Sequence, residues 1–163
     1  MKHVCTLILA LFCAFPLRAL EPAQGPVLLT VTGAISVTNA EGRADFDRAM
    51  LESLDWQEVT TYSEFFTGPE RLAGPTLSSL LRVLGATGRS MQAHAVDDYM
   101  IEIPVSDADR YDVIVALDRG GEPMRIRNKG PIWLIYPTSD PNGPGELHSS
   151  RMVWQLIHLH VVP

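Results

Sequence analysis

The chain has 163 residues, 46% of them hydrophobic, and this length suits a single globular domain. Its formal net charge is −6, and an acidic chain is a poor partner for nucleic acid, whose phosphates require clustered Lys and Arg. Its two cysteines, Cys5 and Cys13, both precede residue 20, so the chain beyond them has no disulfide, no thiolate nucleophile and no thiolate metal ligand.

The first 20 residues have the layout of a secretory signal peptide. Lys2 supplies a basic start, residues 4–15 are apolar, Pro16 breaks this run, and Ala19 is a small residue at the expected cleavage point. The apolar run is shorter than the ~20 residues that span a bilayer, so we expect cleavage and no membrane span afterwards; an uncleaved anchor is the alternative. We therefore expect a periplasmic or secreted protein.

Residues 21–26 are expected to be a linker, and residues 27–163 a single domain. Residues 27–35 are rich in β-branched side chains and predict a strand. Asp45 is expected to cap a short helix over residues 45–54. The buried stripe of this helix is expected to consist of apolar residues at helical spacing, namely Phe46, Met50 and Leu54.

Residues 57–68 have the composition of a strand or an extended loop, and the clearest helix of the sequence follows over residues 75–85. A glycine, Gly85, stands where a helix commonly ends. The buried face of the helix is predicted to consist of leucines at positions i, i+3, i+4 and i+7, namely Leu77, Leu80, Leu81 and Leu84.

Residues 91–104 are expected to form one or two strands. Tyr99, Ile101 and Ile103 alternate with their neighbours, which predicts that they share a buried face. One helical turn is expected next, with Ser106 or Asp107 as its cap.

Two further strands and a hairpin are predicted in the second half of the chain. Residues 113–118 form a strand in this interpretation, and residues 119–122 turn the chain into a partner strand over 123–127. The sequence GPIWLIYP at 130–137 predicts a buried strand, because five apolar or aromatic residues lie between residues that end strand pairing.

The chain is expected to end with a loop and a strand. Residues 138–150 are polar and rich in Pro and Gly; they are expected either to close over a cavity or to be a surface excursion. Residues 152–162 predict the last strand. Strands dominate and two helices are clear, so the predicted class is α+β with a mixed or antiparallel sheet and two main helices.

Two histidines on the last predicted strand are candidate metal ligands. His158 and His160 are two residues apart, so both point to one face of a strand. A metal site needs a third ligand from His94, His148 or an acid, and a half-exposed strand face is the alternative. The opposite face is predicted to be the core side, with Val153, Ile157, Leu159 and Val161.

Two further groups of charged residues are candidates for binding. Asp97 and Asp98 are adjacent, so on a strand they point to opposite faces and cannot act as an acid–base pair; one of them could bound a pocket, or both could lie in a turn. Arg125 and Arg127 share a face of the predicted strand, with Lys129 close behind. This group predicts an anion site, and the alternative is a solvated strand face.

Several weak motifs follow one another in a characteristic order. They are VTTYSEFFTG, the helix that starts after Gly74, the strand at Asp97-Asp98-Tyr99, then VALDRGGEPM, KGPIWLIYP and a final strand with Trp154. In this order the chain resembles the molybdopterin-binding oxidoreductase domain of the sulfite oxidase superfamily, and in particular its short secreted bacterial members. The resemblance covers residues 28–162.

The resemblance implies a mixed α+β domain and, in the full-length enzymes, a pterin-bound molybdenum ligated by a cysteine thiolate. Such enzymes transfer an oxygen atom or reduce a sulfoxide. The cysteine of the family lies just upstream of the helix, where this chain has residues 59–62 and no Cys. The family's basic residue before the tryptophan of the last strand is Val153 here, with Arg151 two residues earlier. A hydroxyl is a far poorer ligand than a thiolate for such a soft metal.

Three functions follow from this comparison. The favoured one is a secreted stand-alone module without the usual molybdenum chemistry, acting as a sensor or accessory subunit that binds a small anion, a pterin-like ligand, or a periplasmic or membrane-bound partner protein. The alternative is a molybdopterin-dependent oxidoreductase with unusual metal ligation; the third is a structural role. No catalytic residue is predicted. The residues expected to face a cofactor or ligand are Thr60, Thr61, Asp98, Arg125, Arg127, Lys129 and Arg151.

Overall fold

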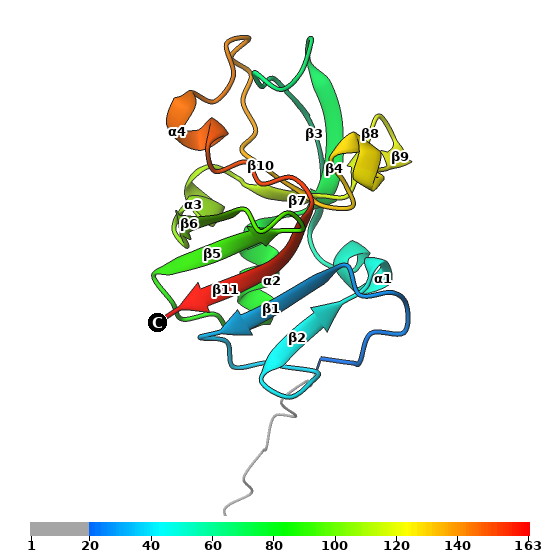
Figure 1. The fold of residues 1–163 in the computed structure, drawn as a ribbon, viewed down its shortest axis with the longest axis vertical. Coiled ribbons are helices and arrows are strands. Elements are labelled where there is room, and N and C mark those ends of the chain that lie inside the picture. The colour runs from blue at the N-terminus through cyan, green and yellow to red at the C-terminus, as the bar shows by residue number, and fades with distance from the viewer. Residues whose placement is uncertain (1–19) are drawn as a thin grey trace, which may run out of the picture.

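A computed structural model describes residues 20–163, and the predicted signal peptide therefore lies almost entirely outside the described residues. The described chain forms a five-stranded sheet with a second group of strands above it (Figure 1). No helix within residues 20–163 has the length and apolar character needed to cross a membrane.

The five-stranded sheet is mixed. Its strand order is β2-β1-β11-β5-β6; β1 and β11 run parallel, while the other neighbours are antiparallel. The strands are β1 (Leu29–Gly33), β2 (Arg43–Phe46), β5 (Ser90–Ala95), β6 (Met100–Pro104) and β11 (Leu156–Val162).

The second group of strands consists of two smaller antiparallel sheets. One has the order β3-β4-β8-β9, and the other pairs β10 with β7. The strands β3 and β4 extend away from the large sheet, towards the top of Figure 1. The members are β3 (Trp56–Thr61), β4 (Glu70–Pro75), β7 (Ile114–Ala116), β8 (Asp118–Arg119), β9 (Glu122–Pro123) and β10 (Trp133–Ile135).

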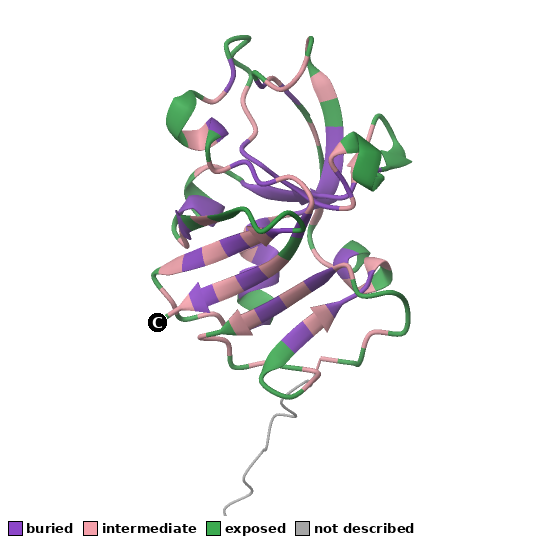
Figure 2. Ribbon diagram, in the orientation of Figure 1, coloured by how far each residue is buried: buried purple, intermediate pink, exposed green. Residues whose placement is uncertain are grey.

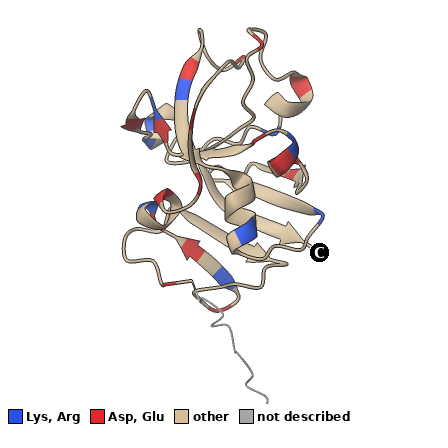
Figure 3. Cartoon of the chain, turned by 180° about the vertical axis from the view of Figure 1, so that it is seen from behind, with Lys and Arg blue, Asp and Glu red and all other residues tan. Residues whose placement is uncertain are grey.

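The helices are short, and α2 is the longest. It covers one face of the five-stranded sheet, as Figure 3 shows from behind, and acidic and basic residues are interspersed on that side of the molecule. The helical segments are α1 (Arg48–Glu52), α2 (Leu77–Val83), α3 (Asp107–Arg110), α4 (Glu146–Ser149) and the 3-10 helix η1 (Ile126–Asn128). This mixture of short helices and mixed sheets confirms the predicted α+β class.

The predicted leucine face of α2 is confirmed. All four leucines, Leu77, Leu80, Leu81 and Leu84, are buried. The helix begins after Thr76, whose side-chain oxygen accepts a 3.2 Å hydrogen bond from the Ser79 N–H. Beyond the helix Gly85 has a φ of 57°, which glycine adopts at little cost. Buried residues of the sheet strands alternate with partly exposed ones, so the core lies between the sheet and α2 (Figure 2).

The prediction for the first helix was wrong at its start. Asp45 lies in β2, where its Oδ1 accepts a 2.8 Å hydrogen bond from the Thr30 hydroxyl, and the cap of α1 is Asp47. Phe46 is buried as predicted, but from a strand. Leu51 is the buried residue of α1. Pairing of β2 with β1 across the intervening turn outweighs the helical pattern that begins at Asp45.

The last strand starts later than predicted and contains a β-bulge. The pairing with β5 shifts register between Leu156 and His158, so one extra residue is inserted. Ile157 is consequently 40% exposed, although the alternation predicted it on the core side, and Leu156 is buried instead. Leu159 and Val161 lie in the core as predicted.

The predicted strand over residues 123–127 is also wrong beyond its first residue. The β8–β9 hairpin ends at Pro123, and the chain then enters η1. Arg125 and Arg127 therefore do not share a strand face. The GPIWLIYP stretch contains the buried strand β10 as predicted; a Cβ at Gly130 would lie 2.6 Å from Met124, so this position requires glycine.

Candidate ligand-binding cavity

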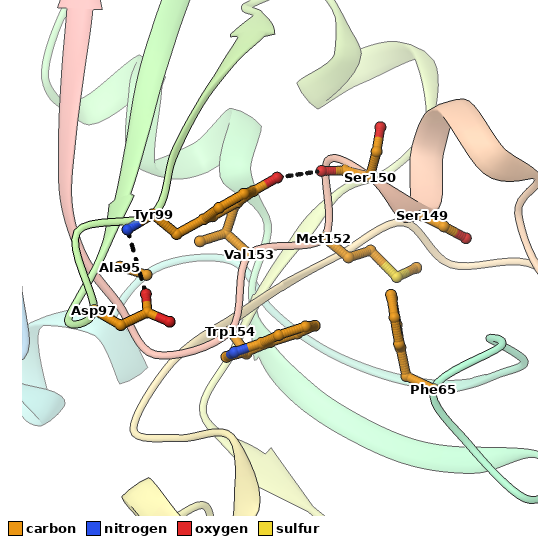
Figure 4. A pocket seen from close by; sticks show the side chains of 9 residues that line it. All are labelled: Phe65, Ala95, Asp97, Tyr99, Ser149, Ser150, Met152, Val153 and Trp154. Atoms are coloured by element: carbon orange, nitrogen blue, oxygen red, sulfur yellow. Dashed lines mark hydrogen bonds between the residues drawn. The ribbon is translucent and has the colours of Figure 1, made fainter.

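A cavity of about 200 Å³ opens between the β5–β6 turn and the segment that follows α4 (Figure 4). It brings together parts of the chain that are far apart in sequence. The lining residues are Phe65, Ala95, Asp97, Tyr99, Ser149, Ser150, Met152, Val153 and Trp154.

Three aromatic side chains and one thioether are among the nine lining residues. In Figure 4, Tyr99 and Trp154 lie on opposite sides of the cavity, and Phe65 and Met152 lie at one end. The Tyr99 hydroxyl donates a 3.1 Å hydrogen bond to the Ser150 carbonyl, which ties the β5–β6 turn to the segment after α4. Phe65 and Trp154 meet edge to face, with ring centroids 5.4 Å apart.

The cavity has one acidic lining residue and no basic one. Asp97 lies at the end opposite Phe65 in Figure 4. Its Oδ1 accepts a 3.3 Å hydrogen bond from the Tyr99 N–H, as expected for an Asx turn, and Oδ2 has no partner within the described chain. The other polar groups are neutral, so Asp97 sets the charge of the lining.

Behind the cavity wall lies an aromatic box formed by Phe65, Trp133 and Trp154. The Lys129 ammonium sits 4.7, 4.6 and 4.4 Å from the respective ring centroids. Burial, together with the charge of Arg119, lowers the pKa of Lys129, whereas the negative ring faces favour the charged ammonium. Two walls of the box, Phe65 and Trp154, also line the cavity.

A buried polar network supports the other side of the cavity. Asp107 Oδ2 accepts hydrogen bonds from the Tyr136 hydroxyl at 2.8 Å and from Arg151 Nη1 at 2.6 Å. Burial, and the hydrogen bond to the Asp107 carboxylate, raise the pKa of Tyr136 well above its ordinary value. His148 of α4 stacks on Tyr136, with ring centroids 5.2 Å apart. Because Arg151 lies between Ser150 and Met152, the network holds two lining residues in place.

The structure separates the two threonines that were expected to face a cofactor. Thr61 is fully buried, and its hydroxyl oxygen accepts a 2.8 Å hydrogen bond from the Thr138 N–H and lies 3.2 Å from the Thr138 carbonyl oxygen. Thr60 points to the opposite side of β3 and is exposed. The Thr61 hydroxyl therefore joins β3 to the segment after β10, and neither threonine lines the cavity.

The other predicted site residues are also dispersed. Asp98 is exposed in the β5–β6 turn with a φ of 64°, and its neighbour Asp97 is the residue that bounds the pocket. Arg125 and Arg127 are exposed at η1. None of the seven residues lines the cavity, although Lys129 and Arg151 lie directly behind its wall; their contact with a ligand stays a prediction.

The predicted histidine pair does share one sheet face. Thr32 Oγ1 lies 2.8 Å from both His158 Nε2 and His160 Nδ1, so one hydroxyl serves both rings. His94 stacks on His158, with centroids 5.1 Å apart. Within residues 20–163, however, no three His, Cys, Asp or Glu residues are arranged to hold a metal ion. The three rings are partly buried on this sheet face.

The residues at the expected ligand position do not fit a cysteine-ligated molybdenum. Residues 20–163 contain no thiolate, and the buried hydroxyl of Thr61 is already bonded to the backbone of Thr138. A soft metal prefers sulfur ligands, and a hydroxyl that is already hydrogen-bonded to the backbone is a far poorer ligand.

The fold recurs in a dehydrogenase. The chain superposes on the crystal structure of the sulfane dehydrogenase SoxCD from Paracoccus pantotrophus with a TM-score of 0.64 and 18% sequence identity. The match covers 88% of this chain and 40% of that chain, so this protein spans less than half of its length. At this identity the likeness shows a shared fold. No protein-family model and no curated protein sequence matches the chain.

Proposed function

We propose that this protein is a small-ligand-binding module built on an oxidoreductase fold, without the molybdenum chemistry that its resemblance implies. The observation that carries the proposal is the cavity between Tyr99 and Trp154, which is lined by side chains from three separate parts of the chain. Convergence of aromatic walls and a few polar groups in one concave site is the usual form of a ligand pocket.

The size and lining of the cavity define the ligand broadly. About 200 Å³ is below the ~300–1,000 Å³ of pockets for drug-sized molecules, so the ligand has few non-hydrogen atoms. Most of the wall is apolar, and its charged group is Asp97. The small anion considered from the sequence finds no basic partner in this lining; Arg125 and Arg127 remain its candidate partners elsewhere on the surface.

Secretion and an accessory or sensory role belong to the same proposal. The layout of residues 1–20 supports export. A module of this kind would report or deliver its ligand to a periplasmic or membrane-bound partner protein.

The competing proposal is a molybdopterin-dependent oxidoreductase with unusual ligation. The fold shared with a sulfane dehydrogenase favours it, whereas the bonded Thr61 hydroxyl opposes it. Molybdenum and pterin should be measured in protein purified from its native host. We expect neither in stoichiometric amount, and finding both would overturn the proposed module.

Methionine methyl groups provide a direct test of ligand binding. Met152 lines the cavity, whereas Met91 is buried in the core of the large sheet. In protein with 13C-labelled methionine methyls, a library of small neutral and charged compounds should include members that shift the Met152 signal and leave Met91 unchanged. If no compound perturbs Met152 at millimolar concentration, the cavity is not a binding site.

A further inference from the structure

We propose that the ligand of this cavity is a small organic cation carrying a methylated ammonium group. The inference rests on the proposed function and narrows it to one chemical class. Two features of the site carry it: the aromatic walls and the charge of the lining. The position of Lys129 shows in addition that these rings can lie next to an ammonium group.

Three aromatic side chains line the cavity. Phe65, Tyr99 and Trp154 come from three different segments and surround one small space (Figure 4). The face of an aromatic ring carries negative charge density, and aromatic pockets recognise methylated ammonium groups through it. A methylated ammonium also suits the apolar remainder of the wall, since its methyl groups do not require hydrogen bonds from the protein.

The charge of the lining has the complementary sign. Asp97 supplies the only formal charge of the nine lining residues. Arg151 is the arginine adjacent in sequence to the lining residues Ser150 and Met152. Its charge is neutralised by an ion pair with Asp107, in which Arg151 Nη1 lies 2.6 Å from Asp107 Oδ2. The whole chain carries a net charge of −6, so its long-range field attracts cations and repels anions.

Lys129 shows that the rings already accommodate an ammonium. Its Nζ lies within 4.7 Å of the centroids of Phe65 and Trp154, and within residues 20–163 no carboxylate oxygen lies within 4 Å of it. This ammonium belongs to the aromatic box and does not line the cavity. Its positive charge opposes a second cation on the cavity side, so its removal should strengthen binding of a cationic ligand.

The test compares choline with its neutral isostere 3,3-dimethylbutan-1-ol, followed by the Met152 methyl signal and by calorimetry. Because the two molecules have nearly the same shape, the difference between their affinities measures the contribution of the positive charge. We expect choline to bind about tenfold more tightly, a difference of the size that ring faces and one carboxylate provide. Asp97→Asn should weaken choline binding several-fold and leave the isostere unchanged.

Two variants complete the experiment. Asp98→Asn is the matched control, because Asp98 is exposed like Asp97 but does not line the cavity, and this variant should bind choline as the unmodified chain does. Lys129→Met keeps the length of the side chain, removes the charge, and should tighten choline binding.

The outcomes separate this inference from the proposed function. If choline and the isostere bind with equal affinity, the proposal of a cationic ligand is wrong, whereas the proposal of a ligand-binding module is still supported. The same holds if neither compound shifts Met152 while another small molecule does. If no molecule of any charge shifts the Met152 methyl signal, the proposed cationic ligand and the proposed ligand-binding function are both wrong.

Discussion

The Tyr136 hydroxyl donates a 2.8 Å hydrogen bond to Asp107 Oδ2, and this buried contact joins the end of β10 to α3. Arg151 donates to the same oxygen, so one carboxylate holds a phenol and a guanidinium that come from different segments. The side chain of Asp107 is 6% exposed and that of Arg151 is 18% exposed. Removal of the carboxylate would therefore leave the Arg151 guanidinium poorly solvated and without an ion-pair partner.

The first prediction concerns this pair. Asp107→Ala should lower the free energy of unfolding by about 3–5 kcal/mol, because it leaves Arg151 without its buried partner. Tyr136→Phe should cost about 1.5–3 kcal/mol, since it removes one hydrogen bond to a charged group and leaves the Arg151 ion pair in place. Urea unfolding of both variants and of the double variant checks this. Because both substitutions remove the same Tyr136–Asp107 hydrogen bond, the double variant should lose less stability than the sum of the two single losses; an additive result would contradict this.

The sequence could identify Asp107 only as a candidate helix cap. The cap residue of α3 is Ser106, the other candidate, although its side chain makes no capping hydrogen bond. Asp107 lies in the first turn of α3, and its side chain accepts a hydrogen bond from Tyr136. Asp107 is 29 residues from Tyr136 and 44 residues from Arg151, and contacts at such separations leave no local pattern in a sequence. The network could therefore be recognised only from the three-dimensional structure. The leucine face of α2, by contrast, was predictable because its period is local and its burial is complete.

The second prediction concerns Thr61, which joins β3 to the segment after β10. Thr61→Val keeps the shape but removes the acceptor for the Thr138 N–H, so we expect a loss of about 1–3 kcal/mol of unfolding free energy. Hydrogen exchange at the Thr138 amide should accelerate. Thr60→Val is the control, because Thr60 is exposed on the other side of the strand and should change stability by less than about 0.5 kcal/mol. Equal effects of the two substitutions would contradict the role of the Thr61 hydroxyl.

The cavity was missed from the sequence for a physical reason. Phe65, Met152 and Trp154 are the residue types that usually fill a core, and nothing in their local pattern separates a cavity wall from packed interior. The one available signal was Asp97-Asp98, for which a pocket boundary was one of two interpretations. Both interpretations hold in the structure: Asp97 and Asp98 are exposed in the β5–β6 turn, and Asp97 also lines the cavity.

The third prediction concerns Asp47, the cap of α1. Hydrogen bonds from the backbone N–H groups of Met50, Gly25 and Gln24 lower the pKa of its carboxyl. A lowered pKa stabilises the fold above the ordinary Asp value of about 3.9, and this contribution is lost as the pH falls below it. Asp47→Ala should cost about 1 kcal/mol at pH 7, in the range of a lost helix cap, and much less at pH 3. Guanidinium unfolding at both pH values measures this.

Asparagine at the same position provides the control for the charge. Asp47→Asn retains an oxygen that accepts from the Met50 N–H, so α1 keeps its cap at pH 7. Its amide group replaces the oxygen that accepts from Gln24 and Gly25, so this variant should still lose part of the stability that Asp47 contributes. The acid-dependent part of the Asp47 contribution should disappear in this variant. If Asp47→Asn retained the full pH dependence, another carboxyl would be responsible.

The last prediction concerns His158 in the histidine cluster of the large sheet. Burial, and the neighbouring imidazoles of His94 and His160, lower the pKa of His158 below its ordinary value of about 6.5. In the window below 6.5 the unfolded chain therefore binds more protons than the folded one, so stability falls as the pH is lowered through this window. His158→Gln should reduce that loss between pH 6.5 and 5. An NMR titration gives the direct measurement: His94→Gln removes one like charge and should raise the His158 pKa, whereas a His158 that titrates at or above 6.5 in the unmodified chain contradicts the prediction.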